Sequence, residues 1–182
     1  MKTSQRLLCW ISAVVLSASA LPLQAEPFLK VGQLAPLFSG HDQDGRRWSL
    51  SHYLGKKYVL VYFYPDDDTA GGVAEAVGLR DNLVQFKQAG VEVVGISTDG
   101  RRSHKEFSFK YGLPFPLLAD RSGGLSQTYG ALMDENKKMD RRISFLIGLD
   151  GRILHITDSP DPSVHLRAMG QIAVDLSGKN SL

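Results

Sequence analysis

The sequence predicts an α/β fold with a mixed central β-sheet and helices on both of its faces. Residues 58–64 and 91–97 are continuous runs of β-branched, aliphatic and aromatic residues, as expected of strands buried on both faces of a sheet. A helical pattern follows each run, and residues 143–157 contain two further strand runs around Asp150-Gly151. Strands that alternate with helices and end in a hairpin indicate a mixed sheet covered on both sides.

Residues 1–25 are expected to be a secretory signal peptide. Lys2 and Arg6 precede an apolar stretch over residues 7–20, and small residues follow, which is the pattern of a cleavable leader. We expect cleavage after Ala25, with Ala20 as the alternative. An uncleaved membrane anchor is the other interpretation, but the stretch is short for a span of about 20 residues. We therefore predict an exported protein, in the periplasm, with a single domain at residues 26–182.

Loss of this leader would change both the charge and the cysteine content. The chain has 21 Lys and Arg against 19 Asp and Glu, and because Lys2 and Arg6 lie in the leader, the remainder is balanced. Balanced charge gives no reason to expect a nucleic-acid partner, and no membrane partner is expected after cleavage. Cys9 is the only cysteine, so the exported domain would have no thiol and would depend on its apolar core for stability.

The first half of this domain contains a turn, a buried strand and a long helix. Asp44-Gly45 predicts a tight turn, and Trp48 and Leu50 are expected on one face of the short strand that follows. After the strand at residues 58–64, Thr69 can cap a helix that extends to Gly90. The inward face of this helix is predicted from three- and four-residue spacing as Val73, Ala76, Val77, Leu83, Val84 and Phe86.

The second half continues the alternation. A strand is predicted at residues 91–97, a helix at 103–111, a short strand at 115–120 and one or two helical turns at 125–129. The hairpin has strands at 143–149 and 152–157. A last amphipathic helix is expected at 163–176, with Val164, Met169, Ile172 and Leu176 facing the core.

The segment after the first buried strand, YFYPDDDTAGGVAEAVGLRD at residues 62–81, resembles the active-site segment of a peroxiredoxin. It is similar to the bacterioferritin comigratory protein type of the alkyl hydroperoxide reductase/thiol-specific antioxidant family, in which Pro, three residues, Thr, two residues and Cys follow one another. GISTDG (95–100), FPLLAD (115–120) and RRISFLIGLDGRI (141–153) match the same family in order and spacing. The resemblance covers about residues 28–176 and implies a thioredoxin-like fold.

The resemblance also implies a reaction, the thiol-dependent reduction of hydrogen peroxide and organic hydroperoxides in an antioxidant role. A cysteine in the first turn of a helix has a lowered pKa because the positive end of the helix and a nearby arginine favour the thiolate. The thiolate attacks the peroxide O–O bond and becomes a sulfenic acid. A second cysteine resolves this species, and a thioredoxin-like reductant restores the enzyme.

The chain lacks the residues that perform this chemistry. The resemblance places Pro65, Thr69 and Arg142 at the supporting positions, but Gly72 stands where the family has its attacking cysteine. Val77 stands at the position of the resolving cysteine, so a reductant would find no thiol to reduce. The sequence therefore predicts a peroxiredoxin-like protein without peroxidase activity.

Pro65, Thr69, Gly72 and Arg142 are consequently expected to form a vestigial pocket, for which two interpretations are open. A helix N-terminus beside an arginine can bind a small anion or a polar ligand. Alternatively, Thr69 only caps the helix and Arg142 pairs with a carboxylate, which we favour because capping is the commonest role of such a threonine. Gly71 and Gly72 are expected to clear space at the start of the helix.

The remaining polar clusters have simpler explanations. Asp66, Asp67 and Asp68 are expected to form a solvated loop, since three adjacent acids cannot all face one ion. The five histidines (His41, His52, His104, His155 and His165) lack metal-binding spacing, and His41 and His155 are expected to be structural or exposed. Arg101, Arg102, Lys105 and Lys110 are expected on a solvent-facing helix surface. We expect no metal and no cofactor.

Three functions remain compatible with the sequence. The first is an exported, inactive family member that binds a partner or a ligand in the vacated pocket. The second is an oxidoreductase that takes its thiol from a partner. The third is an uncleaved protein that keeps Cys9. This cysteine would lie in or beside the bilayer, far along the chain from the pocket. The resemblance implies a monomer or a dimer.

Overall fold

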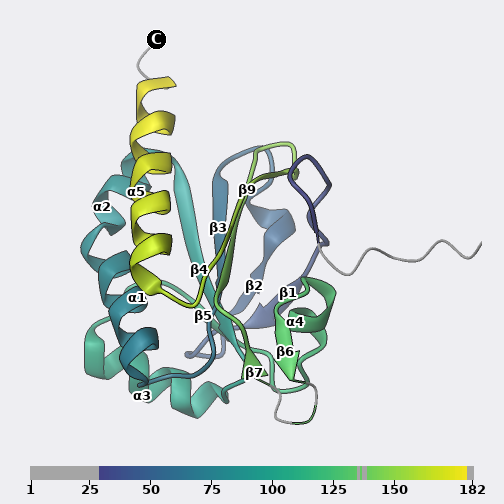
Figure 1. Ribbon diagram of the computed structural model, residues 1–182, viewed down its shortest axis with the longest axis vertical. Coiled ribbons are helices and arrows are strands. Elements are labelled where there is room, and N and C mark those ends of the chain that lie inside the picture. The colour runs from purple at the N-terminus through teal and green to yellow at the C-terminus, as the bar shows by residue number, and fades with distance from the viewer. Residues whose placement is uncertain (1–28, 135, 137–138, 180–182) are drawn as a thin grey trace, which may run out of the picture.

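The computed structural model describes residues 29–134, 136 and 139–179. It contains one five-stranded sheet and two small hairpins (Figure 1). The sheet has the order β5-β4-β3-β8-β9, in which β3, β4 and β5 are parallel and β8 is antiparallel to both of its neighbours, β3 and β9. The strands of the sheet are β3 (Tyr58–Phe63), β4 (Val91–Ser97), β5 (Leu117–Ala119), β8 (Ile143–Ile147) and β9 (Ile153–Asp158).

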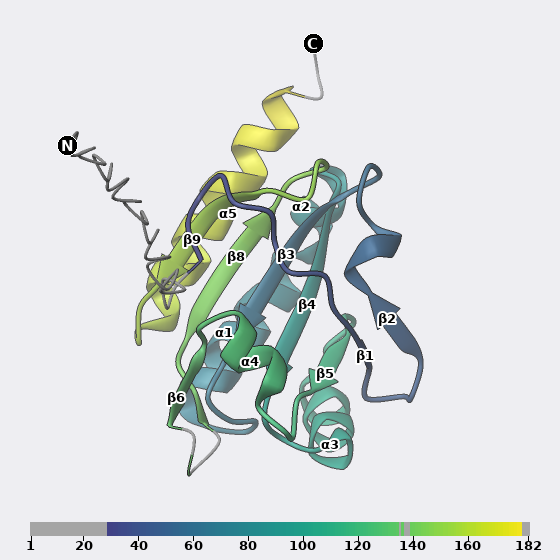
Figure 2. The same cartoon turned by 90° about the vertical axis from the view of Figure 1, so that its right-hand side faces the viewer.

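Helices cover both faces of this sheet, as the sequence predicts. One face carries α1, α2 and α5, and the other carries α4 with the β1–β2 hairpin, as Figure 1 shows. Figure 2 looks onto the face that carries α4. The helices are α1 (Ala70–Asp81), α2 (Leu83–Gln88), α3 (Arg101–Tyr111), α4 (Gly124–Thr128), α5 (Pro162–Lys179) and the 3-10 helix η1 (Leu50–His52). The hairpin strands are β1 (Ser39–His41), β2 (Arg47–Ser49), β6 (Leu132–Asp134) and β7 (Met139–Asp140).

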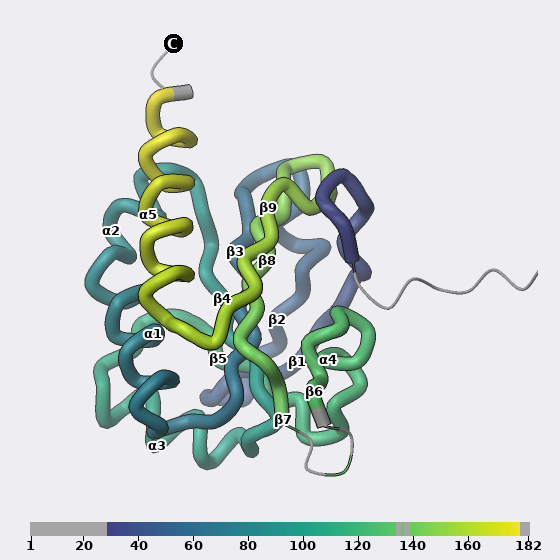
Figure 3. The backbone as a smooth tube through the Cα atoms, in the orientation of Figure 1, coloured from purple at the N-terminus to yellow at the C-terminus, as the bar shows by residue number. Residues whose placement is uncertain are grey.

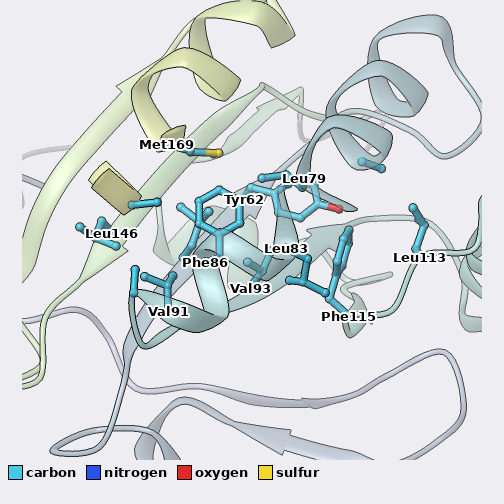
Figure 4. Packing of buried hydrophobic residues seen from close by; sticks show 14 of the residues in the cluster. Tyr62, Leu79, Leu83, Phe86, Val91, Val93, Leu113, Phe115, Leu146 and Met169 are labelled. Atoms are coloured by element: carbon cyan, nitrogen blue, oxygen red, sulfur yellow. The ribbon is translucent and has the colours of Figure 1, made fainter. Parts of the chain in front are cut away.

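The core consists of two apolar clusters separated by the sheet. Along β3, Leu60 and Tyr62 belong to the cluster beneath α1, α2 and α5, whereas Val59, Val61 and Phe63 belong to the opposite cluster. This alternation follows from the two-residue period of a strand, and it explains why the strand sequence is apolar throughout. Figure 4 shows the first cluster, in which Tyr62, Leu79 and Phe86 pack between the sheet and Met169 of α5.

Several local expectations need correction. The helix predicted to extend from Thr69 to Gly90 is divided into α1 and α2 at Asn82, whose side-chain amide donates to the carbonyl oxygen of Gly78. Val84, predicted to face the core, is 67% exposed, because the break changes the direction of the helical face. Leu50 is buried as expected but lies in η1 rather than in a strand. The hairpin β6–β7 has no counterpart in the sequence prediction.

The long-range predictions are confirmed. β8 and β9 form the expected antiparallel hairpin, and α5 packs on α1 and α2 with Met169 and Leu176 buried. Figure 3 follows the chain from residue 29 past the β8–β9 turn, where Leu34 bridges to Arg152. Among the described residues, no helix is both long and apolar enough to cross a membrane. The predicted leader lies outside them.

Candidate functional site

Helix α1 begins at the end of the central strand β3, and Thr69 is its N-cap. The backbone N–H of Gly72 donates to Thr69 Oγ1 at 3.2 Å, and the Thr69 hydroxyl donates to the carbonyl oxygen of Asp66 at 3.1 Å. A threonine in this position satisfies one of the N–H groups that a helix start leaves without an intrahelical partner. The capping interpretation of Thr69 is therefore confirmed, and its hydroxyl is occupied on both sides.

The two glycines that follow are packed closely, so the expectation that they clear space is wrong. A Cβ atom added to Gly71 would lie 2.7 Å from Nη2 of Arg142. A Cβ atom added to Gly72 would lie 2.5 Å from the carbonyl oxygen of Asp66 and 3.0 Å from Thr69 Oγ1. The Arg142 guanidinium and the Asp66–Thr69 turn occupy the space beside the helix start.

Arg142 immediately precedes β8, and its side chain is buried against α1. Its Nη1 forms a short ion pair with Oε2 of Glu75, and the side chains are 5% and 0% exposed. Its Nε donates to the carbonyl oxygen of Pro160 at 3.4 Å. The expected pairing of Arg142 with a carboxylate is confirmed, and Glu75, which the sequence analysis did not single out, is the partner.

Burial dominates the electrostatics of this pair. It raises the pKa of Glu75 to about 7, although the charge and the hydrogen bond of Arg142 oppose the rise. Glu75 Oε1 has no hydrogen-bond partner among the described residues and lies 3.7 Å from Nδ1 of His165. A carboxylate that is dehydrated and bonded at only one oxygen is costly to ionise.

His165 of α5 is fully buried beside this pair and is held in one tautomer. Its Nε2 lies 2.9 Å from the carbonyl oxygen of Ser159, which can only accept, so Nε2 carries the proton. Nδ1 then accepts from the Ser144 hydroxyl at 2.7 Å. Burial lowers the pKa of His165, and the nearby Arg142 charge lowers it further. The ring is therefore a neutral structural group, not an acid or base poised for catalysis.

Of the three aspartates before the helix, Asp66 and Asp68 are exposed, as the sequence predicts, but the prediction of a solvated loop is wrong for Asp67. The Asp67 side chain is 4% exposed; its Oδ2 lies 2.9 Å from Nδ1 of the buried His104, and its Oδ1 accepts from the Tyr64 hydroxyl at 2.8 Å. Burial alone would raise the pKa of Asp67, but the bond to His104 holds it below its usual range. Asp68 is exposed and pairs with Lys110. The sequence gives no local signal for these contacts, because His104 lies on α3.

A cavity of about 260 Å³ adjoins the buried arginine. Asp140, fully buried, accepts from the Ser126 hydroxyl at Oδ2, while its Oδ1 has no partner among the described residues. Burial raises the pKa of Asp140 to about 7, and neighbouring acids add to the effect. Two of the four predicted residues, Pro65 and Arg142, line this cavity, and Thr69 and Gly72 do not. Its lining comprises Pro65, Met133, Asp140, Arg141, Arg142, Asp158 and Pro160.

The position that the resemblance assigns to the resolving cysteine also carries no reactive group. Val77 lies in α1 and is partly buried, and Cys9 lies outside the described residues. Among the described residues, no group of three or more His, Cys, Asp or Glu is arranged to hold a metal ion. His41 and His155 are exposed, as expected.

Comparison with known proteins identifies the class to which this fold and helix start belong. The AhpC/TSA family pattern matches residues 31–156. A putative peroxiredoxin of the bcp type from Coxiella burnetii is 43% identical over 130 residues, covering 69% of this chain and 85% of the relative. Peroxiredoxin Bcp of Escherichia coli strain K12 is 43% identical over 142 residues, covering 75% and 90%.

Solved structures agree with the sequence comparison. The crystal structure of peroxidoxin BcpB from Mycobacterium tuberculosis superposes with a TM-score of 0.73 at 28% identity, covering 83% of this chain and 97% of that protein. Peroxiredoxin Q of Xanthomonas campestris gives a TM-score of 0.69 at 25% identity, covering 78% and 90%. The fold is thioredoxin-like. The chain belongs to the AhpC/TSA family and is a peroxiredoxin of the bacterioferritin comigratory protein type with glycine at the family's cysteine position.

Proposed function

We propose that this protein is a peroxiredoxin homologue that has lost thiol peroxidase activity and acts by binding. The observation that carries the proposal is Gly72, which lies in the first turn of α1 at the position that the family gives to its attacking cysteine. A Cβ atom at this position would lie 2.5 Å from the Asp66 carbonyl oxygen, so no side chain fits without movement of the turn.

The neighbouring groups do not replace the missing thiol. Reduction of a peroxide requires a nucleophile that accepts one oxygen atom and is then regenerated. The Thr69 hydroxyl, which is engaged in the helix cap, is no redox nucleophile. Arg142 is paired with Glu75 and has no thiolate to stabilise. Loss of the first chemical step therefore removes the whole family reaction from this chain.

Peroxide consumption by the purified protein tests this proposal. We expect no consumption of hydrogen peroxide or an organic hydroperoxide above the buffer blank, with dithiothreitol or with thioredoxin and its reductase. A Cys9→Ser variant of the full chain controls for the leader thiol. Turnover by the natural chain in dithiothreitol would contradict the proposal, and turnover that requires thioredoxin would favour the partner-thiol oxidoreductase.

The Gly72→Cys variant is the matched comparison. A thiol at this position enters the first turn of a helix, where the helix dipole favours its ionised form. Because its Cβ would approach the Asp66 carbonyl oxygen to 2.5 Å, the Asp66–Thr69 turn must shift to admit it. Far-ultraviolet circular dichroism and thermal unfolding report whether the variant is folded. If a folded variant consumes peroxide, the assay and the remaining scaffold are competent, and the inertness of the natural chain follows from the missing thiol.

We further propose that the protein is exported to the periplasm and loses residues 1–25. The support is the leader pattern of Lys2, Arg6 and the apolar stretch at residues 7–20. The mass of the protein recovered from a periplasmic extract is expected to match a chain that begins at Glu26, or at Leu21 for the alternative cleavage. A full-length mass in the membrane fraction would instead support the anchored form that retains Cys9.

A further inference from the structure

Three polar side chains, those of Asp120, Ser126 and Asp140, form a hydrogen-bonded cluster beside α4. Ser126 lies in α4, Asp140 is the last residue of β7, and Asp120 directly follows β5. Ser126 and Asp140 are fully buried. Figure 1 shows α4 close to β6 and β7 at one end of the molecule. The cluster therefore joins α4 and the turn after β5 to β7.

The Ser126 hydroxyl is shared between the two carboxyl groups. Its Oγ lies 2.9 Å from Oδ2 of Asp120 and 2.9 Å from Oδ2 of Asp140. A hydroxyl group has a single proton to donate, so it can serve only one carboxylate at a time. Both contacts are hydrogen bonds at once only when one of the carboxyl groups is protonated and donates to Ser126 Oγ. The arrangement is therefore complete only with a bound proton.

Asp140 is the carboxyl group that suits this proton. Asp120 accepts from the backbone N–H of Ser126 at 2.8 Å and from the Ser122 hydroxyl at 3.2 Å, so its carboxylate is well supplied with donors. Oδ1 of Asp140, in contrast, has no partner among the described residues. Burial of a carboxylate with so few donors is costly, and it raises the pKa of Asp140 to about 7.

The charges around Asp140 add to the cost of ionising it. Acidic groups act on it from three other segments, and these are Asp66, Asp99 and Asp120. The two arginines that follow it in the chain have carboxylate partners of their own, since Arg141 pairs with Asp158 at 2.9 Å and Arg142 pairs with Glu75. Loss of the proton consequently leaves a buried negative charge with the Ser126 hydroxyl as its single donor among the described residues.

We propose that Asp120, Ser126 and Asp140 form a pH-sensitive switch, which holds α4 against β7 while Asp140 is protonated and releases this contact when the proton is lost to solvent. With the proton in place, Asp140 donates to Ser126 and the Ser126 hydroxyl donates to Asp120. Without it, the two carboxylates compete for the one hydroxyl proton and repel each other across it. The contact between α4 and β7 is then no longer satisfied on both sides.

The switch is connected to the cavity beside Arg142. Asp140 forms part of the wall of this cavity. The backbone N–H of Arg141 donates to the carbonyl oxygen of Ala131 at 2.8 Å, and the N–H of Ala131 donates to the carbonyl oxygen of Ser126 at 2.7 Å. A change at α4 therefore reaches the cavity wall through two backbone hydrogen bonds. The inference does not depend on the loss of peroxidase activity, because no residue of the switch lies in α1.

A nuclear magnetic resonance titration from pH 5.5 to pH 8.5 tests the switch. The carboxyl carbon of Asp140 should titrate near pH 7, and the amide resonances of Ser126 and Ala131 should shift with the same midpoint. Hydrogen exchange of the Ala131 N–H, corrected for the intrinsic effect of pH on exchange, should accelerate about tenfold or more over this range. Amide groups of β4 should exchange more slowly at every pH, because they are exposed only when the whole fold opens.

Three variants isolate the role of the proton. Asp140→Asn keeps a neutral side chain that can donate to Ser126, so exchange at Ala131 should stay slow at pH 8.5. Ser126→Ala removes the shared hydroxyl, so exchange at Ala131 should already be fast at pH 5.5. Ser122→Ala removes a different hydroxyl that donates to Asp120. It is the matched control and should keep the pH dependence of the natural protein.

The same measurements can overturn the proposal. An Asp140 carboxyl group that is ionised throughout the titration would do so. Exchange at Ala131 that does not change with pH in the natural protein, or that changes equally in Asp140→Asn, would also contradict the switch. Equal effects of Ser122→Ala and Ser126→Ala would show that the shared hydroxyl of Ser126 is not the connecting group.

Discussion

Replacement of Arg142 by Met is expected to lower the free energy of unfolding by about 3–5 kcal/mol at pH 8, because it leaves a buried carboxylate without its partner. Glu75 is 0% exposed, and Arg142 provides its only ion pair with a permanently charged side chain among the described residues. The measurement is urea unfolding followed by circular dichroism. The loss should be smaller at pH 5, because Glu75 then escapes the penalty by binding a proton.

Two matched variants separate this explanation from simple loss of packing. Glu75→Gln/Arg142→Met removes the charge together with its partner and should recover most of the lost stability, since replacing a buried ion pair is often neutral. Arg141→Met removes the neighbouring guanidinium, which pairs with the half-exposed Asp158, and should have a small effect. If Arg142→Met alone costs the same at pH 5 and pH 8, ionisation of Glu75 is not the cause.

The free energy of unfolding is also expected to increase as the pH is lowered from 8 to 5. The folded pKa values of Asp140 and Glu75 are both raised to about 7. A raised carboxyl pKa means that the folded protein binds the proton more tightly than the unfolded chain does. The stabilising contribution of such a carboxyl group is complete below its pKa in the unfolded chain and is lost as the pH rises through its pKa in the folded protein. For Asp140 the upper limit of this contribution to the free energy of unfolding is about 4 kcal/mol.

The variant Asp140→Asn tests the origin of this slope. The amide resembles the protonated carboxyl in shape and carries no charge, so the pH profile should become flatter and stability at pH 8 should rise. Asp175→Asn, an exposed site on α5 that accepts a hydrogen bond from Gln171, is the control and should leave the slope unchanged.

Asp67 acts in the opposite sense, because its lowered pKa stabilises the fold at higher pH. Its contribution is lost below about pH 4, outside this window. The lowered pKa of His165 opposes the increase inside the window, below about pH 6.5, but one histidine offsets only part of the contribution of the two carboxyl groups. A free energy of unfolding that decreases as the pH is lowered from 8 to 5 would contradict the assignment.

Much of the fold is predictable from the sequence because its signals are local. The apolar runs at residues 58–64 and 91–97 become β3 and β4, and the Asp150-Gly151 turn joins β8 to β9. Boundaries are less accurate: α3 begins at Arg101 rather than Ser103, and α5 extends from Pro162 to Lys179. The break at Asn82 depends on a side-chain bond to the preceding turn, which helical periodicity alone does not reveal.

The candidate site likewise combines local features that the sequence predicts with contacts between distant segments that it does not. The threonine cap is a local feature and was predictable, since Thr69 bonds within three residues of its own position. The sequence predicts that Arg142 pairs with a carboxylate but not with which one, because Glu75 is 67 residues away in sequence. Asp67 was expected in solvent, yet its partner His104 is 37 residues distant and lies on another helix. Burial of a charged group depends on which distant partner reaches it, and no local pattern encodes that.

The α/β class, the family resemblance and the absence of a cysteine at residues 72 and 77 follow from the amino-acid sequence alone. These are properties of composition, spacing and residue identity. The position of Arg142 and the Asp66 carbonyl in the space beside Gly71 and Gly72 is visible only in the folded chain. The same holds for the ion pair of Asp67 with His104, which joins two separate segments. The physical reason is that close packing and charge clustering depend on distances between segments far apart in the chain, which are set when the helices dock on the sheet.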